Sequence, residues 1–294
     1  MGRTATWDAW KPNPADTSQR VAMLVDTSTC IGCKACEVAC KQWNQNMTTP
    51  EADGRDFDSY QERSWTGSYQ SHATLDQNSW TVIKFIEHED KDTGALQWLF
   101  LKESCMHCLD APCIKACPKS ALSKGDYGLT MLDRDKCEDQ GKCVDACPYG
   151  VIHTGKVRGY KDDKAGKCTL CYDRIANGMQ PACVKTCPTD CIKYGDRNAL
   201  IAWGKQRVEE LKARGYTRAN LYGETEYGGL HHLYVLLEPP QVYGLPVPTA
   251  TASDFGGLTD SPALAGSPTM LVASALVSMI GWVINRRMEN ERKD

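Results

Sequence analysis

The chain has 294 residues, of which 41% are hydrophobic, and a formal net charge of -3 at pH 7. This length allows one or two domains with a sizeable core, and the scattered basic residues argue against a nucleic-acid partner. The 16 cysteines exceed what a core requires. The N-terminus lacks an apolar run that could act as a signal peptide, which argues against disulfides and favours metal or iron-sulfur chemistry.

A polar arm, residues 1–20, precedes the first cysteine group, which has the spacing C-x2-C-x2-C-x3-C and comprises Cys30, Cys33, Cys36 and Cys40. Three thiolates at this spacing can converge on one cluster, while the following turn carries the fourth away. In two-cluster ferredoxins that fourth cysteine binds the other cluster, so the group predicts a partner elsewhere in the chain.

A polar stretch without periodicity, residues 45–79, predicts a surface insertion. Two β-rich runs follow within residues 79–102 and are joined by a polar, glycine-containing segment, which predicts a hairpin. Its aromatic residues are expected to be core and cover residues, as buried aromatic side chains usually are.

Three further cysteine groups follow, and each ends in a Cys-Pro pair. They comprise Cys105, Cys108, Cys113 and Cys117; Cys137, Cys143 and Cys147; and Cys168, Cys171, Cys183 and Cys187. The proline has a fixed φ and no N–H, which holds the turn open where the last cysteine crosses to its cluster. Cys191 lies outside all the groups and is most simply a small buried residue.

Nesting is the simplest pairing: the first group with the fourth and the second with the third. Each group then gives three ligands to one cluster and its last cysteine to the companion cluster. The expected sets are Cys30, Cys33, Cys36 and Cys187; Cys168, Cys171, Cys183 and Cys40; Cys105, Cys108, Cys113 and Cys147; and Cys137, Cys143 and Cys117.

The last set lacks one thiolate, because Gln140 stands where the spacing would place it. A neutral amide is a poor iron ligand beside thiolate, so the iron at that corner would be loosely held or absent. We therefore expect three 4Fe-4S clusters and one 3Fe-4S cluster. A four-iron cluster capped by Asp139 or water is the lesser alternative at the incomplete site.

The C-terminal third of the chain predicts a different set of elements. Residues 196–237 contain an amphipathic helix, expected over 198–214, and a short strand, and residues 238–261 resemble an extended linker. Residues 262–285 predict a single membrane-spanning helix of marginal hydrophobicity. The basic tail, residues 286–294, then places the C-terminus in the cytoplasm and the cysteine-bearing body on the other side of the membrane.

The expected fold class is therefore α+β, with two tandem ferredoxin-like units, nested cysteine groups over residues 21–195 and a C-terminal transmembrane helix. Zinc is the rival for the cysteines, but its paired C-x2-C units are usually closed within one stretch, unlike the compact groups here. The histidines His107, His231 and His232 are more simply solvent-facing or packed residues than ligands. Nucleotide-binding glycine patterns are absent from the sequence, so the chain is expected to move electrons without being the catalytic subunit.

Several segments together resemble the beta, iron-sulfur subunit of membrane-bound, molybdopterin-dependent formate dehydrogenase. They include DTSTCIGCKACEVAC, CMHCLDAPCIKACP, KCTLCYDRIANGMQPACVKTCPTDCI and QRVEELKARGY. The cysteine groups alone would also fit the iron-sulfur subunits of nitrate, dimethyl sulfoxide or polysulfide reductases. The KARGY segment and the apolar tail favour formate dehydrogenase.

The resemblance implies a catalytic alpha subunit with molybdenum or tungsten, which oxidises formate, and a membrane cytochrome b gamma subunit that receives the electrons. It also implies the nested cluster pairing and an inner-membrane location, with the body exported by a twin-arginine signal on the catalytic partner. Gln140 departs from the family, where formate enzymes have cysteine. Relatives such as nitrate reductase lose this cysteine as well and hold a three-iron cluster there.

Overall fold

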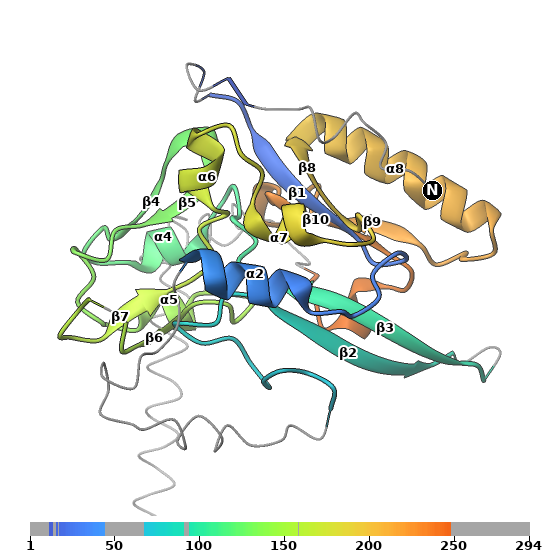
Figure 1. Ribbon diagram of the computed structural model, residues 1–294, viewed down its shortest axis with the longest axis horizontal. Coiled ribbons are helices and arrows are strands. Elements are labelled where there is room, and N and C mark those ends of the chain that lie inside the picture. Colours follow the sequence, from blue (N-terminus) through green and yellow to red (C-terminus); the bar gives the residue numbers. More distant parts are fainter. Residues whose placement is uncertain are drawn as a thin grey trace, which may run out of the picture. The chain divides into compact units, whose positions relative to one another are not determined.

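The computed structural model describes residues 12, 13, 16, 18–44, 68–90, 94–157 and 159–247 (Figure 1). The chain divides into two compact units, Met1–Pro248 and Thr249–Asp294, and all described residues belong to the first. The predicted membrane segment, residues 262–285, lies outside the described residues, as do the basic tail and almost all of the N-terminal arm. Within the described part, the structure contains no helix that is both long and apolar enough to cross a bilayer.

A mixed sheet of four strands organises the first unit. Its order is β8 (Ile192–Asp196), β1 (Val21–Asp26), β10 (His232–Leu236) and β9 (Asn220–Tyr222). Strand β1 runs antiparallel to β8 and parallel to β10, while β10 and β9 are antiparallel. The sheet therefore pairs a strand that precedes the cysteine groups with strands that follow them in the sequence.

Every residue of β1 is buried, because both faces of the sheet are covered. Successive side chains of a strand point to opposite faces. Val21, Met23 and Val25 accordingly pack into the core that contains the cysteines, whereas Ala22 and Leu24 pack into a second core. Helix α8 (Arg197–Ala213) forms the other side of that second core and lies along the sheet in Figure 1.

Helix α8 is the helix expected over residues 198–214. The Asp196 side chain accepts a hydrogen bond from the Ala199 amide at 3.0 Å, which caps the helix N-terminus. Leu200, Val208 and Leu211 are buried against the sheet. The amphipathic pattern thus identifies the face that packs.

The expected hairpin consists of β2 (Val82–Glu89) and β3 (Leu96–Glu103), which pair antiparallel in a register that places Ile83 opposite Lys102. Trp98 is half exposed and packs edge-on against Phe85, so it covers the core without belonging to it. Part of the predicted surface insertion before the hairpin is packed: Leu75 is buried, and Asn78 Nδ2 donates to the Lys156 carbonyl at 2.9 Å.

Short helices and two small hairpins carry the cysteine groups. The helices are α2 (Ala35–Asn44), α4 (Pro112–Ala116), α5 (Lys142–Asp145), α6 (Tyr172–Ala176) and α7 (Ala182–Thr186), and the hairpins are β4 (Leu122–Lys124) with β5 (Thr130–Leu132) and β6 (His153–Gly155) with β7 (Lys164–Gly166). Helix α2 packs against α7, and α4 packs against α5. The first cysteine group thus meets the fourth, and the second meets the third.

Three 3-10 turns complete the described elements: η2 (Asp126–Gly128), η3 (Glu226–Gly228) and η4 (Pro240–Tyr243). The last of these lies in the predicted extended linker. Tyr243 and Leu245 are buried there, so the first part of that segment folds onto the body instead of leaving it. These two side chains pack into the core that contains the cysteines. The high proline content of the segment had indicated an extended linker instead.

Candidate metal centres

The four cysteine loops share one backbone feature. In each, the residue before the second ligand position has a positive φ: Gly32 at 64°, His107 at 48°, Asp139 at 50° and Leu170 at 53°. Such turns direct successive backbone N–H groups inward and form concave sites for anions, including iron-sulfur clusters. Non-glycine residues adopt this conformation at an energetic cost, so the surrounding loop must enforce it.

Site 1 is a cavity formed by the first and fourth cysteine groups. It contains about 350 Å³ of space free of protein atoms and is lined by Cys30, Cys33, Cys36, Cys187 and Cys191. The first four of these are the set expected from nesting. Cys33 is exposed, so this site lies close to the protein surface.

Site 2 lies between the same two groups. Its cavity, of about 300 Å³, is lined by the four cysteines of the second expected set, Cys40, Cys168, Cys171 and Cys183. All four are buried. The Leu170 amide donates to Cys168 Sγ at 3.3 Å, and Asn44 Nδ2 donates to Cys40 Sγ at 3.6 Å. Such donors stabilise thiolate sulfur and raise the reduction potential of a bound cluster.

Site 3 is formed by the second and third groups, with the expected set Cys105, Cys108, Cys113 and Cys147. Burial raises the pKa of the Cys108 thiol, and the next largest contributions come from the other three members of the set. Cys147 packs with Cys105 in one apolar cluster and against the cluster that contains Cys108 and Cys113, so the four cysteines lie together. His107, the residue before Cys108, is fully buried, and its Nδ1 accepts a hydrogen bond from the Thr130 amide.

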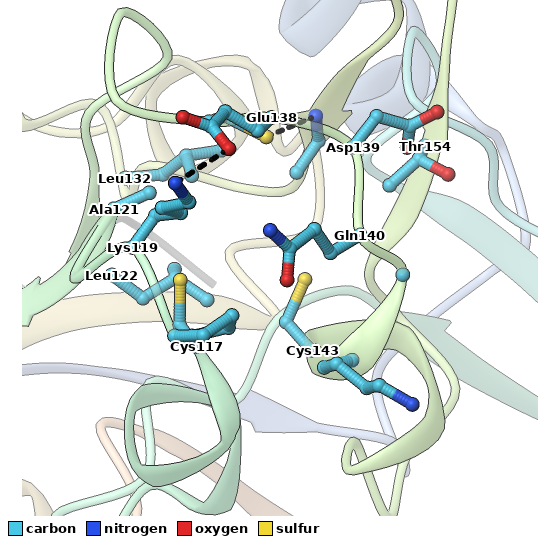
Figure 2. A pocket seen from close by; sticks show the side chains of 15 residues that line it. Cys117, Lys119, Ala121, Leu122, Leu132, Glu138, Asp139, Gln140, Cys143 and Thr154 are labelled. Atoms are coloured by element: carbon cyan, nitrogen blue, oxygen red, sulfur yellow. Dashed lines mark hydrogen bonds and ion pairs between the residues drawn. The ribbon is translucent and has the colours of Figure 1, made fainter.

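Site 4 is a cavity of about 380 Å³ lined by Cys117, Cys137, Cys143 and Gln140. In Figure 2 the side chains of Cys117, Cys143 and Gln140 point toward one another. Gln140 follows Asp139 just as Cys33 follows Gly32, so the amide occupies the ligand position of an otherwise conventional loop. The Ala165 amide donates to Cys137 Sγ at 3.4 Å.

The four sites follow one another in the order 1, 2, 3, 4. Sites 1 and 2 share the packed helices α2 and α7, and sites 3 and 4 share the packed helices α4 and α5. Cys105 of site 3 lies in one apolar cluster with Cys40 and Cys168 of site 2, which joins the two pairs. Both ends of this series reach the surface, at Cys33 and at Gln140.

The donor chemistry fits iron-sulfur clusters. Burial and mutual repulsion raise the pKa of Cys168 and of Cys113 to about 12, so a bound cation is needed to hold such thiols as thiolates. Cluster iron supplies this charge and is typically held by four cysteines. Among the residues that the structure describes, no three His, Cys, Asp or Glu side chains converge at the spacing of a single metal ion.

The structure brings together all the residues of the expected sets and adds two that the sequence analysis did not assign. Cys191 lines site 1 as a fifth cysteine. It lies four residues after the last cysteine of the fourth group, a position that Ala121 and Val151 occupy in the second and third groups. Lys102 also lines site 1 and is buried. A lysine among the apolar residues of β3 was the only signal for it. His107, His231 and His232 are packed in the interior.

Two stretches of the chain match family models described as a 4Fe-4S dicluster domain, residues 29–121 and 96–197. The expectation of two tandem dicluster domains of mixed helix and strand is thus confirmed. The chain is 37% identical to the iron-sulfur subunit of the nitrate-inducible formate dehydrogenase of Escherichia coli (strain K12), over 99% of this chain and 96% of the relative.

Two further relatives extend the comparison. The formate dehydrogenase-O iron-sulfur subunit of Escherichia coli (strain K12) is 40% identical over 80% of this chain and 74% of the relative. The formate dehydrogenase subunit beta of Megalodesulfovibrio gigas is 34% identical over 67% of this chain and 86% of the relative. The similarity therefore includes chains beyond a single organism.

Proposed function

Because the chain belongs to the family of formate dehydrogenase iron-sulfur subunits, we propose that it carries electrons from a molybdopterin catalytic subunit to a membrane cytochrome b. The resemblance seen in the sequence is thereby confirmed, and it implies electron transfer. The observation that carries the proposal is the series of four cysteine-lined sites with a surface residue at each end. Clusters at successive sites of such a series would let an electron pass through the protein, whose interior otherwise does not conduct electrons.

Sites 1, 2 and 3 each provide four thiolates, which would hold a 4Fe-4S cluster. Site 4 provides three thiolates and the Gln140 amide, which would hold a 3Fe-4S cluster or an incompletely ligated 4Fe-4S cluster. Such clusters supply one-electron redox chemistry when bound. The protein's own contribution is to space the thiolates, exclude water from site 2, where all four cysteines are buried, and direct backbone amides toward the sulfur atoms.

The two ends of the series have different surroundings, which suits the entry and exit of electrons at different partners. Site 1 opens beside the exposed residues Ile31 and Cys33. Site 4 opens beside Gln140 and the ion pair of Lys119 with Glu138, whose Nζ–Oε2 distance is 2.8 Å. We assign one opening to the catalytic subunit, with molybdenum or tungsten, and the other to the route toward the cytochrome.

The membrane part of the proposal depends on the sequence alone. Residues 262–285 would anchor the chain in the inner membrane beside the cytochrome, with the C-terminus in the cytoplasm and the cluster domain on the periplasmic side. Deletion of residues 262–294 tests this directly. The truncated chain is expected in the soluble periplasmic fraction, and its unchanged recovery with the membrane would contradict the anchor.

The electron-transfer role is tested in the complex isolated anaerobically through a tag on this chain. Formate is expected to bleach the cluster absorption as fully as dithionite does. Bleaching by dithionite but not by formate would contradict a formate dehydrogenase partner. Identification of the co-purified large subunit would then distinguish the nitrate, dimethyl sulfoxide or polysulfide alternatives.

A further inference from the structure

Lys102 is a fully buried lysine that lies between two cluster sites. It is located near the end of β3, is 1% exposed, and lines the cavity of site 1. The thiols that act on it most strongly are Cys183 and Cys168 of site 2, followed by Cys36 of site 1 and Cys40 of site 2. Lys102 therefore lies in the wall of site 1 and within electrostatic reach of the cysteines of site 2.

The charge of Lys102 has little other compensation in the described part of the chain. Its Nζ donates to Ser104 Oγ at 2.9 Å, and no carboxylate of the described residues lies within ion-pair distance of it. Ser104 Oγ in turn lies 3.1 Å from Nδ1 of His232, whose pKa burial lowers, so this neighbour is neutral. The carboxylate of Glu37 is directed elsewhere and accepts from the Ile83 amide at 2.6 Å.

Other lysines near the sites have different partners. Lys167 is also buried, but its Nζ donates to two backbone carbonyls, those of Thr130 and Cys168. Lys84, on the neighbouring strand, pairs with Glu103 at 2.7 Å and is partly exposed. A buried charge requires a partner, and the nearby negative charge available to Lys102 is that of the thiolates.

Lys102 retains its proton in these surroundings. Burial lowers the pKa of Lys102, but the cysteines of sites 1 and 2 act in the opposite direction, and the pKa lies above its usual value. The ammonium in turn lowers the pKa values of Cys36, Cys40 and Cys168, although burial still leaves each of them raised. The interaction is therefore reciprocal across both sites.

We propose that Lys102 is a shared electrostatic residue that raises the reduction potentials of the clusters at sites 1 and 2 together. The inference rests on the proposed cluster function. A cluster gains a negative charge on reduction, and a fixed cation in a low-dielectric interior stabilises that state. Because one cation acts on both sites, both reduction potentials rise. The difference in potential between the two clusters, which an electron crosses when it moves from one to the other, then changes little.

The test is a potentiometric titration of the full complex, with each cluster followed by low-temperature electron paramagnetic resonance. Lys102→Met keeps the length of the side chain and removes its charge. The equilibrium constant for reduction at sites 1 and 2 is expected to fall at least tenfold. This lowers each reduction potential by about 59 mV for one electron. Sites 3 and 4 serve as internal references and are expected to shift less.

Two further variants separate charge from packing. Lys102→Arg keeps the charge and is expected to restore the wild-type potentials, while Lys84→Met removes a nearby surface lysine and is expected to change none of them. If Lys102→Met loses iron at sites 1 and 2, Lys102→Gln replaces it as the uncharged variant and is compared with Lys102→Arg. Unchanged potentials without the charge, or equal shifts at all four sites, would overturn the proposal. A complete absence of clusters in the wild-type protein would instead overturn the proposed function.

Discussion

The Sγ atom of Cys191 lies 3.4 Å from the Sγ atom of Cys187, inside the cavity of site 1. Hydrogen bonding to Cys191 lowers the pKa of Cys187 to about 5 and is also the largest cause that lowers the pKa of Cys30, to about 7. When a cluster is bound, Cys187 and Cys30 would be thiolates without a proton, so the Cys191 thiol would be the donor. Cys191 thus supports two ligands of one site without being a member of the expected set.

Cys191→Ala removes this S–H donor and is expected to lower the reduction potential of the cluster at site 1, because hydrogen bonds to ligand sulfur favour the reduced state. The shift should not exceed about 59 mV, a factor of ten in the reduction equilibrium. Potentiometric titration measures it. Cys191→Ser keeps a donor and is the matched control; an equal shift in both variants would indicate a packing effect.

Gln140→Cys is expected to complete the ligand set of site 4 and to convert a three-iron cluster into a four-iron cluster. The oxidised variant should lose the three-iron paramagnetic resonance signal and gain about one iron atom per chain. Asp139→Asn is the control, because asparagine tolerates the positive φ of this position. A wild-type protein that is silent when oxidised would show that site 4 already holds four irons.

Gly32→Ala is expected to weaken the loop of site 1 by two effects. A left-handed conformation costs an L-residue about 1–2 kcal/mol, and Gly32 has a φ of 64°. The added Cβ would also lie 3.0 Å from ring atoms of Phe85 and Phe100. Gly94→Ala is the control: Gly94 has a similar φ of 66°, but an added Cβ there would contact no neighbouring atom. It therefore measures the backbone effect alone. Denaturant unfolding should show the larger loss for Gly32→Ala, and equal losses would contradict the packing argument.

His231 predicts an acid sensitivity of the fold. Burial lowers the pKa of His231 from 6.5 to about 4, although the hydrogen bond from its Nδ1 to the Val21 carbonyl opposes this, and Lys124, Arg197 and Arg20 lower the pKa further. Below about pH 6.5 the unfolded chain therefore binds a proton that the folded chain does not. Stability should fall by on the order of 2 kcal/mol as the pH drops from about 7 to about 5.

His231→Asn keeps a hydrogen-bond donor toward Val21 and removes the titration. The free energy of unfolding, measured anaerobically across this pH range, should then depend less steeply on pH than in the wild-type protein. The same slope in both proteins would show that His231 does not contribute.

The cysteine sets could be predicted from the sequence because short spacers decide which sulfur atoms can face one cavity. The gap at Gln140 was visible for the same reason, and the left-handed Asp139 before it shows that the loop keeps its shape without the thiolate. The amphipathic pattern likewise predicted α8. Apart from the last cysteine of each set, which comes from a distant group and was expected from nesting, these features depend on contacts close in the sequence.

The central sheet could not be predicted in this way. Strand β1 pairs with β8 and β10, which follow it by about 170 and 210 residues along the chain, and such pairings leave no local pattern. The role of Lys102 was hidden for a similar reason. Its strand pattern indicated a hairpin, and only the three-dimensional approach of sites 1 and 2 reveals the position of its ammonium group near both.

Elemental analysis tests most directly whether the four sites hold iron-sulfur clusters. Iron, zinc and acid-labile sulfide should be measured together in the anaerobically purified full-length protein. Three four-iron clusters and one three-iron cluster predict about 15 iron atoms and about 16 sulfides per chain, with no bound zinc. Bound zinc without iron or sulfide would show that the four sites do not hold iron-sulfur clusters.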